Sequence, residues 1–186
     1  MSDTIGAGPE TFQFLPNYAN LIAEAANQWA YIEYLVAKSI WLLADVKPAM
    51  GACVTSHVYT THAKLSALLA LLKLRKAPQP LIDKVNKFAA DFRDGAEARN
   101  RLVHDVWLTD NLHPDKMGKL RITADKILKF KAETIESEAL AADVLIIEKR
   151  RKEMTAISRE IEVALPTLPE MSHSELHPIV ESHADQ

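Results

Sequence analysis

Apolar residues recur at steps of three and four along most of the chain, which is the spacing that places side chains on one face of an α-helix. Pro16 suits the first turn of a helix, and Ser137 followed by Glu138 suits the start of another. The pattern predicts four helices, over about 16–45, 49–76, 81–107 and 137–165. The chain is therefore expected to be mainly α-helical.

The period changes between residues 108 and 136, where apolar and polar residues alternate. Two alternating segments, 120–123 and 127–131, predict either a β-hairpin, which 106–109 can join, or an irregular excursion. Four long helices with short links are typical of a bundle. The predicted fold is thus all-α, a four-helix bundle with a small β-hairpin or irregular excursion between helices three and four.

The length of 186 residues suits one domain with its own core. We predict a flexible leader over 1–15, a helical bundle over 16–166 and a mobile polar tail over 167–186. The formal net charge of −3 gives no general attraction to a polyanion, although it leaves room for a local basic site. Charge alone therefore points to no partner.

Cys53 is the only cysteine, which excludes an intrachain disulfide and a cysteine-rich zinc site and fits a reducing compartment. The first residues lack the basic region and apolar core of a signal peptide. No uncharged apolar run approaches the roughly 20 residues that a membrane-spanning helix needs. We expect a cytoplasmic protein that does not enter a membrane, with no cofactor and no bound metal.

One charged residue interrupts the apolar face of the predicted third helix. Stepping by three and four from Leu81 leads to Arg99 and then to Val103. Arg99 is therefore predicted to point toward the packed side, where a guanidinium is unfavourable unless a partner or a ligand compensates its charge. Asn100 and His104 are four residues apart and share a helix face. Three polar side chains thus converge near the end of this helix.

These side chains suit the cleavage of a phosphodiester without a metal. An imidazole can move a proton near neutral pH, and a guanidinium can bind phosphate oxygens in a fork and offset developing charge. An amide can orient either group. In RNA the nucleophile can be the substrate's own 2′-hydroxyl, so the protein need not supply a nucleophile.

The segment Arg99-Asn100-Arg101-Leu102-Val103-His104 resembles the R-x4-H motif of HEPN domains, which lies late on the third helix of a four-helix bundle and often has asparagine after the arginine. The resemblance extends to the predicted architecture over about 17–165. It implies a metal-independent endoribonuclease whose two motifs face one cleft in a homodimer, in a toxin–antitoxin or antiviral defence role. Arg99 and His104 would be catalytic, Asn100 would support them, and an antitoxin or another protein would be a further partner.

Two alternatives stay open beside this hypothesis. Many HEPN members have no demonstrated nuclease activity, so the chain could instead be a noncatalytic helical module that binds a partner protein or a nucleotide through the same groove. A structural alternative pairs Arg99 with a carboxylate such as Glu24 or Glu33 and leaves His104 to cap the helix end.

The residues around the motif are expected to have structural roles. Arg101 is predicted to lie on the surface and pair with Glu97, four positions earlier. Asp105 could orient His104, but solvation is the favoured interpretation. Trp107 is predicted to pack at the edge of the bundle rather than to stack on bases.

Other residues with reactive side chains receive ordinary interpretations. Cys53 is predicted to be a small core residue, and His57 and His62 are predicted to be surface or boundary residues. The charged run 148–153 is interpreted as a solvated face whose four cations could help guide a phosphate backbone. An incidental cluster, rather than a metal site, is expected from the histidines of the tail, which are His173, His177 and His183.

Overall fold

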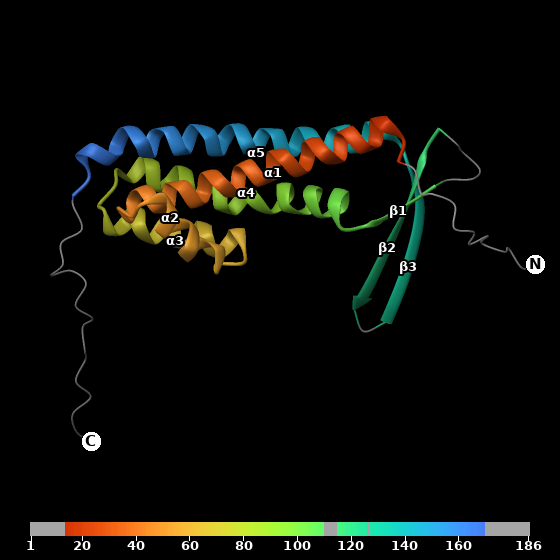
Figure 1. Cartoon of the computed structure of the whole chain (residues 1–186), viewed down its shortest axis with the longest axis horizontal. Helices are drawn as coiled ribbons and strands as arrows, with labels where there is room; N and C mark the ends of the chain where they lie inside the picture. The colour runs from red at the N-terminus through yellow and green to blue at the C-terminus, as the bar shows by residue number, and fades with distance from the viewer. Residues whose placement is uncertain (1–13, 110–114, 126, 170–186) are drawn as a thin grey trace, which may run out of the picture. The chain divides into compact units, whose positions relative to one another are not determined.

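The computed structural model describes residues 14–109, 115–125 and 127–169, with side chains for all of these except 121–131 (Figure 1). Within these ranges the chain is mostly helical, with a small sheet between the fourth and fifth helices. In chain order the elements are α1 (Pro16–Leu43), α2 (Pro48–Ser56), α3 (Thr61–Leu74), α4 (Gln79–Val103), β1 (Val106–Thr109), β2 (Met117–Asp125), β3 (Ile127–Ile135), α5 (Ser137–Ala164) and the short 3-10 helix η1 (Leu165–Thr167).

The chain forms two compact units. Unit 1 consists of the described residues of Met1–Ile32 together with Ala90–Glu153, and unit 2 consists of Glu33–Ala89 together with the described residues of Met154–Gln186. The sheet and the R-x4-H motif belong to unit 1, whereas α2 and α3 belong to unit 2. Most of the predicted leader and tail, including the three tail histidines, lies outside the described residues.

The predicted first and last helices are confirmed, but the single helix predicted over 49–76 is wrong. This segment forms α2 and α3, which are separated at residues 57–60. Thr60 has an extended backbone, and its side chain accepts a hydrogen bond from the Ala63 N–H at 3.1 Å, so it acts as an N-cap and starts a new helix. The apolar spacing continued across this break and hid it.

The predicted third helix is also too long, because α4 ends at Val103 and Trp107 lies in a strand. The predicted hairpin is confirmed as β2 and β3, and residues 106–109 join it as the edge strand β1. All pairs are antiparallel in the order β1-β2-β3, with Trp107 opposite Lys119 and Met117 opposite Ile135. The fold is thus mainly α-helical with a three-stranded sheet.

In unit 1 the predicted solvated face at 148–153 is wrong for one residue, Arg150, which is 4% exposed. Its guanidinium donates two hydrogen bonds to the Asp94 carboxylate, at 2.9 and 2.7 Å, and one to Glu153 at 2.6 Å. A Cβ on Gly95 would lie 3.0 Å from Cγ of Arg150. The glycine in α4 therefore makes room for the buried arginine stem.

In unit 2, α3 buries Leu65, Leu68 and Leu72 along one face. The side chain of Trp41 packs where a Cβ on Gly51 would stand, so α2 approaches α1 closely at this glycine. Cys53 is exposed, and its predicted place in the core is wrong, because α2 turns this side outward. His57 and His62 are exposed, in agreement with the prediction.

Unit 2 also contains a buried arginine without full hydrogen bonding. Arg75 is 6% exposed, and its Nε has no hydrogen-bond partner among the described residues. A buried donor that lacks a partner destabilises the folded state. We expect Arg75→Met to raise the free energy of unfolding by about 1 kcal/mol in urea titration, since methionine fills similar space without a charge. A lower free energy of unfolding for the variant would contradict this interpretation.

No helix in the part of the chain that the structure describes is both long and apolar enough to cross a bilayer.

Candidate active site at the end of helix α4

The end of α4 is fixed by local hydrogen bonds. The backbone N–H of His104 donates to the carbonyl of Asn100 at 3.1 Å, which completes the last helical turn. The indole Nε1–H of Trp107 donates to the carbonyl of Leu102 at 3.0 Å and satisfies one of the acceptors that a helix leaves open at its C-terminus. The chain then turns into β1, so His104 is the first residue after the helix.

The structure brings together the three residues that the motif predicted. Arg99 Nη1 donates to Oδ1 of Asn100 at 3.1 Å and also contacts Nε2 of His104. A guanidinium can only donate hydrogen bonds, so Arg99 is the donor toward Nε2 of His104 in this contact. Arg99 therefore joins the amide to the imidazole in a three-membered cluster.

Arg99 is half-buried, so it lies at the edge of the packed side rather than within it. The buried face of α4 continues from Phe92 through Ala98 and Leu102, while Arg99 is half-buried and Val103 is exposed. Leu81 and Arg99 are 18 residues apart, which is about five full turns, so Arg99 is in line with the apolar face, but the buried positions at the end of α4 are Ala98 and Leu102 on one side of that line. The exposed Asn100 and His104 and the half-buried Arg99 lie at the surface of unit 1.

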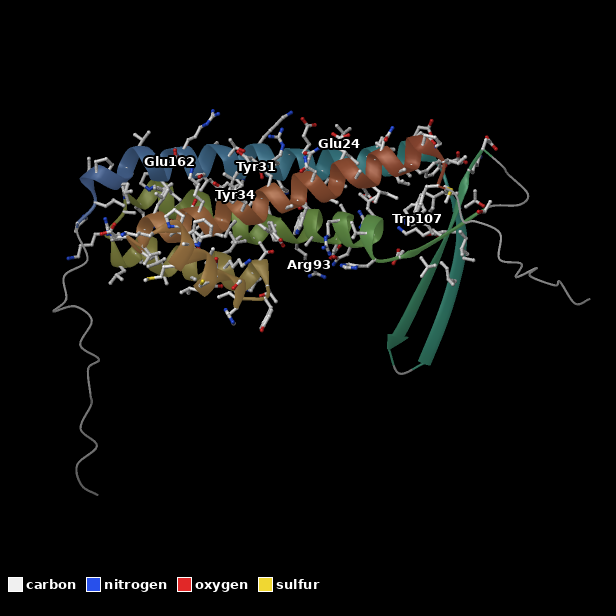
Figure 2. All side chains as sticks on the ribbon, viewed as in Figure 1. Glu24, Tyr31, Tyr34, Arg93, Trp107 and Glu162 are labelled. Carbon is white, nitrogen blue, oxygen red and sulfur yellow. The ribbon has the colours of Figure 1, made fainter. Side chains whose placement is uncertain are left out.

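The structural alternative paired Arg99 with Glu24 or Glu33, but both carboxylates have other partners. Glu24 accepts a hydrogen bond from Gln28 at 2.9 Å within α1, and Glu33 accepts one from Thr61 at 2.8 Å within unit 2. Glu24 is labelled on α1 in Figure 2. The partners of Arg99 are instead its neighbours in the motif.

Arg101 does not pair with Glu97 as predicted. It donates two hydrogen bonds to the carboxylate of Asp143 on α5, at 3.1 and 2.5 Å, and this contact raises the pKa of Arg101. Glu97 pairs with Arg93 on α4 at 2.8 Å, and both side chains are exposed; Arg93 is labelled in Figure 2. The second arginine of the motif therefore ties α4 to α5 within unit 1, and the sequence held no signal for this distant partner.

Asp105 is not solvated, contrary to the prediction. Its side chain is 15% exposed, and its Oδ2 lies 3.1 Å from Nζ of Lys119 on β2. The Lys119 ammonium also lies 5.3 Å from the ring centroid of Trp107. Lys119 is 5% exposed, so a lysine from an alternating strand has become part of the core. A signal was available, because Lys119 shares a strand face with the buried Met117 two residues earlier.

Trp107 is packed, as predicted. It is 8% exposed and is labelled in Figure 2. The ring centroids of Phe14 and Tyr18 each lie 6.2 Å from the centroid of its ring. The Tyr18 hydroxyl donates to the carbonyl of Ile135 at 2.6 Å, which connects α1 to the last strand. These aromatic contacts hold the start of β1 against α1.

An apolar groove of about 480 Å³ lies beside the motif. One wall comes from α1 and the other from the end of α4 and the start of β1. Its lining is almost entirely apolar: Phe14, Ala19, Ile22, Ala23, Ala26, Leu102, Val103 and Trp107. Leu102 and Val103 belong to the R-x4-H segment, so the groove includes two of its apolar positions, whereas Arg99, Asn100 and His104 are not among the lining residues.

Among the described side chains there is no group of three or more histidine, cysteine, aspartate or glutamate residues that could hold a metal ion. Comparison with models of known families, with curated proteins and with solved structures finds no match to this chain.

Proposed function

We propose that this chain is a HEPN-like endoribonuclease that cleaves RNA without a metal and acts as a homodimer, built on the four-helix bundle that the sequence predicts. The contact of Arg99 with both Asn100 and His104 at an exposed helix end carries this proposal. In this proposal Arg99 binds phosphate, His104 transfers a proton and Asn100 orients them, and their mutual contact supports these roles. The HEPN resemblance supplies the reaction, and the geometry supports it.

The chemistry begins when a phosphate oxygen of RNA replaces the imidazole as a partner of the Arg99 guanidinium. Nε2 of His104 is then free to accept the proton of the 2′-hydroxyl. The 2′-oxygen attacks phosphorus, the bond from phosphorus to the 5′-oxygen breaks, and a second imidazole, which carries both ring protons, donates one of them to that leaving oxygen. The products are a 2′,3′-cyclic phosphate and a 5′-hydroxyl. Arg99 offsets the charge that develops on the phosphate.

A dimer supplies the second imidazole, because each protomer contributes one His104. The apolar groove beside the motif supports association at this place, since an exposed apolar surface next to a polar cluster is typical of an interaction site. We propose that the dimer acts in the cytoplasm in a toxin–antitoxin or antiviral defence role, with RNA as substrate and an antitoxin or another protein as partner.

The test compares the wild type, Arg99→Ala and His104→Ala on single-stranded RNA in the presence of a chelator. The wild type is expected to produce fragments with 2′,3′-cyclic phosphate ends, and both variants are expected to lose this activity while staying folded by circular dichroism. RNA with 2′-O-methyl groups should resist cleavage, because it lacks the nucleophile. Equal cleavage by all three proteins would assign the activity to another site or to contamination.

The groove also favours a second candidate, a noncatalytic module that binds a partner protein or a nucleotide. In that case a partner would bind with unchanged affinity when His104 is replaced by alanine, and Ala23→Arg in the groove wall would prevent binding. A wild-type chain that binds such a partner and does not cleave RNA would favour this candidate over the nuclease.

A further inference from the structure

One buried cation in unit 2 has no acceptor for its hydrogen bonds. Arg75 directly follows α3 and is 6% exposed. Its Nε is buried and has no hydrogen-bond partner, and none of the described residues forms an ion pair with its guanidinium. The two terminal Nη nitrogens make no hydrogen bond to a described residue and are not fully buried, so a ligand can reach them. Because a guanidinium stays protonated in proteins, this position holds a charge that the described part of the fold does not neutralise.

The backbone at Arg75 is fixed by the way α3 ends. The N–H of Lys76 donates to the carbonyl of Lys73 at 3.0 Å, and the N–H of Ala77 donates to the carbonyl of Leu72 at 2.9 Å. These two bonds form a Schellman motif, in which Lys76 has a φ of 51°. Glycine is the usual residue there, since other residues are strained at positive φ. The chain therefore carries two neighbouring cations at positions where an uncharged residue would have a lower free energy.

The charged residues of the sequence around this turn have one sign. Asp45 and Asp83 bound a segment, residues 46–82, that contains no aspartate or glutamate, and we call it the acid-free segment. Asp83 itself accepts a hydrogen bond from Gln79 at 2.7 Å. The acid-free segment contains five lysine or arginine residues, which are Lys47, Lys64, Lys73, Arg75 and Lys76. It therefore contributes a positive potential at the turn, although the whole chain has a formal net charge of −3.

Helix stability and packing do not account for Arg75. The dipole of α3 favours a cation in its last turn, but this effect needs no burial and acts on the exposed Lys73 as well. Packing alone would favour an apolar side chain, since methionine fills similar space without a buried donor. Residues that break such rules without a structural gain are expected at functional sites. The unmatched donors of Arg75 therefore indicate a ligand with acceptor oxygens.

We propose that Arg75 is the anchoring cation of a phosphate-binding site at the turn between α3 and α4, separate from the R-x4-H motif. A guanidinium binds phosphate oxygens through two parallel N–H donors, and the positive potential of the acid-free segment favours a ligand with more than one negative charge. A phosphate compound meets both conditions, whereas a single carboxylate does not. The phosphate group belongs either to a small phosphorylated compound or to an RNA backbone, and the site does not depend on the proposed cleavage of RNA.

The first test measures the binding of inorganic phosphate to the full chain through thermal unfolding. The wild type, Arg75→Met and Lys87→Met are each heated in phosphate and in chloride of the same ionic strength. Phosphate at about ten times its Kd is expected to raise the Tm of the wild type by about 3 °C relative to chloride. Lys87→Met is the matched control and should respond like the wild type, because Lys87 is an exposed cation of unit 2 outside the acid-free segment.

Arg75→Met is expected to have the same Tm in phosphate and in chloride. In chloride its Tm should exceed that of the wild type, since the unmatched donor is gone, and phosphate should narrow this difference by stabilising only the wild type. If Arg75→Met does not fold, Arg75→Lys takes its place, because lysine keeps the charge and lacks the fork. Its Kd for the ligands tested is expected to be about tenfold above that of the wild type, and equal Kd values would overturn the proposal.

The second test identifies the source of the phosphate group. It uses single-stranded 2′-O-methyl RNA, which the proposed ribonuclease cannot cleave, and measures binding by fluorescence anisotropy. If the site takes an RNA backbone, Arg75→Met should weaken binding and make the slope of log K against log salt concentration less steep by about 0.7, the value for one phosphate contact of a single strand. RNA binding that Arg75→Met leaves unchanged, together with the response to phosphate, assigns the site to a small phosphorylated compound.

The outcomes for this site and for the proposed function are separate. If Arg75→Met equals the wild type toward both inorganic phosphate and RNA, the phosphate-binding site does not exist. A wild type that does not cleave RNA removes the proposed function and leaves these binding results as they stand, because neither test uses cleavage as its readout.

Discussion

Replacing Arg99 with lysine is expected to lower metal-independent RNA cleavage about 100-fold, although the positive charge is kept. The guanidinium contacts Asn100 and His104 from the same nitrogen, and its other N–H groups remain to bind phosphate. The ammonium of lysine is a point charge without this planar fork, so it cannot hold the amide, the imidazole and a phosphate in the same geometry. The measurement is the initial rate of cleavage of a labelled RNA in the presence of a chelator.

Arg93→Lys is the matched control for this substitution. Arg93 lies on the same helix, its side chain is 87% exposed, and it pairs with Glu97 one turn away. Such an exposed pair contributes little, so the rate should stay within about twofold of the wild type. Equal rates for the two lysine variants would show that Arg99 acts only through its charge, and this would contradict the role assigned to its fork.

Replacing Arg150 with methionine is expected to lower the free energy of unfolding by about 3 kcal/mol. The arginine is buried, and it donates hydrogen bonds to Asp94 and Glu153, with Asp91 at 3.8 Å. Methionine keeps part of the packing beside Gly95 but leaves three carboxylates near one another without their cation. These carboxylates are roughly half exposed and regain some hydration, so the effect is expected at the lower end for a broken buried pair.

Urea titration followed by circular dichroism measures this difference. Lys84→Met serves as a control, because Lys84 pairs with Glu160 at an exposed position and should change the free energy of unfolding by less than about 0.5 kcal/mol. Arg75→Met is a second control with the opposite expected sign. If Arg150→Met and Lys84→Met had the same free energy of unfolding, the hydrogen bonds of Arg150 to Asp94 and Glu153 would not contribute the stability predicted here.

The contribution of Arg150 to the free energy of unfolding should also depend on pH. Its hydrogen bonds lower the pKa of Asp94 in the folded state. The stabilisation is therefore present above the pKa of Asp94 in the unfolded chain, about 4, and is lost as the pH falls through the lower folded value. We expect the difference between the wild type and Arg150→Met to be full at neutral pH and to shrink in acid.

Periodicity identified the elements of this fold well because it reflects local geometry. The helical repeat marked α1, α4 and α5, and the change to alternation marked the hairpin. The break at Thr60 was missed, since a cap depends on backbone conformation and not on apolar spacing. The end of α4 was placed too late for a similar reason, because the helix gives way to a strand whose partner is β2.

For the candidate site, too, some features follow from the sequence and others depend on tertiary packing. By itself the sequence determined that Arg99, Asn100 and His104 lie close together, because residues within five positions of each other stay near one another at a helix end. Only the tertiary structure decided that Arg99 is half-buried and that Arg101, Asp105 and Arg150 pair with Asp143, Lys119 and Asp94 respectively. Such partners come from other segments of the chain, and the choice among many carboxylates and cations depends on which elements pack together. One sequence contains no direct measure of that packing.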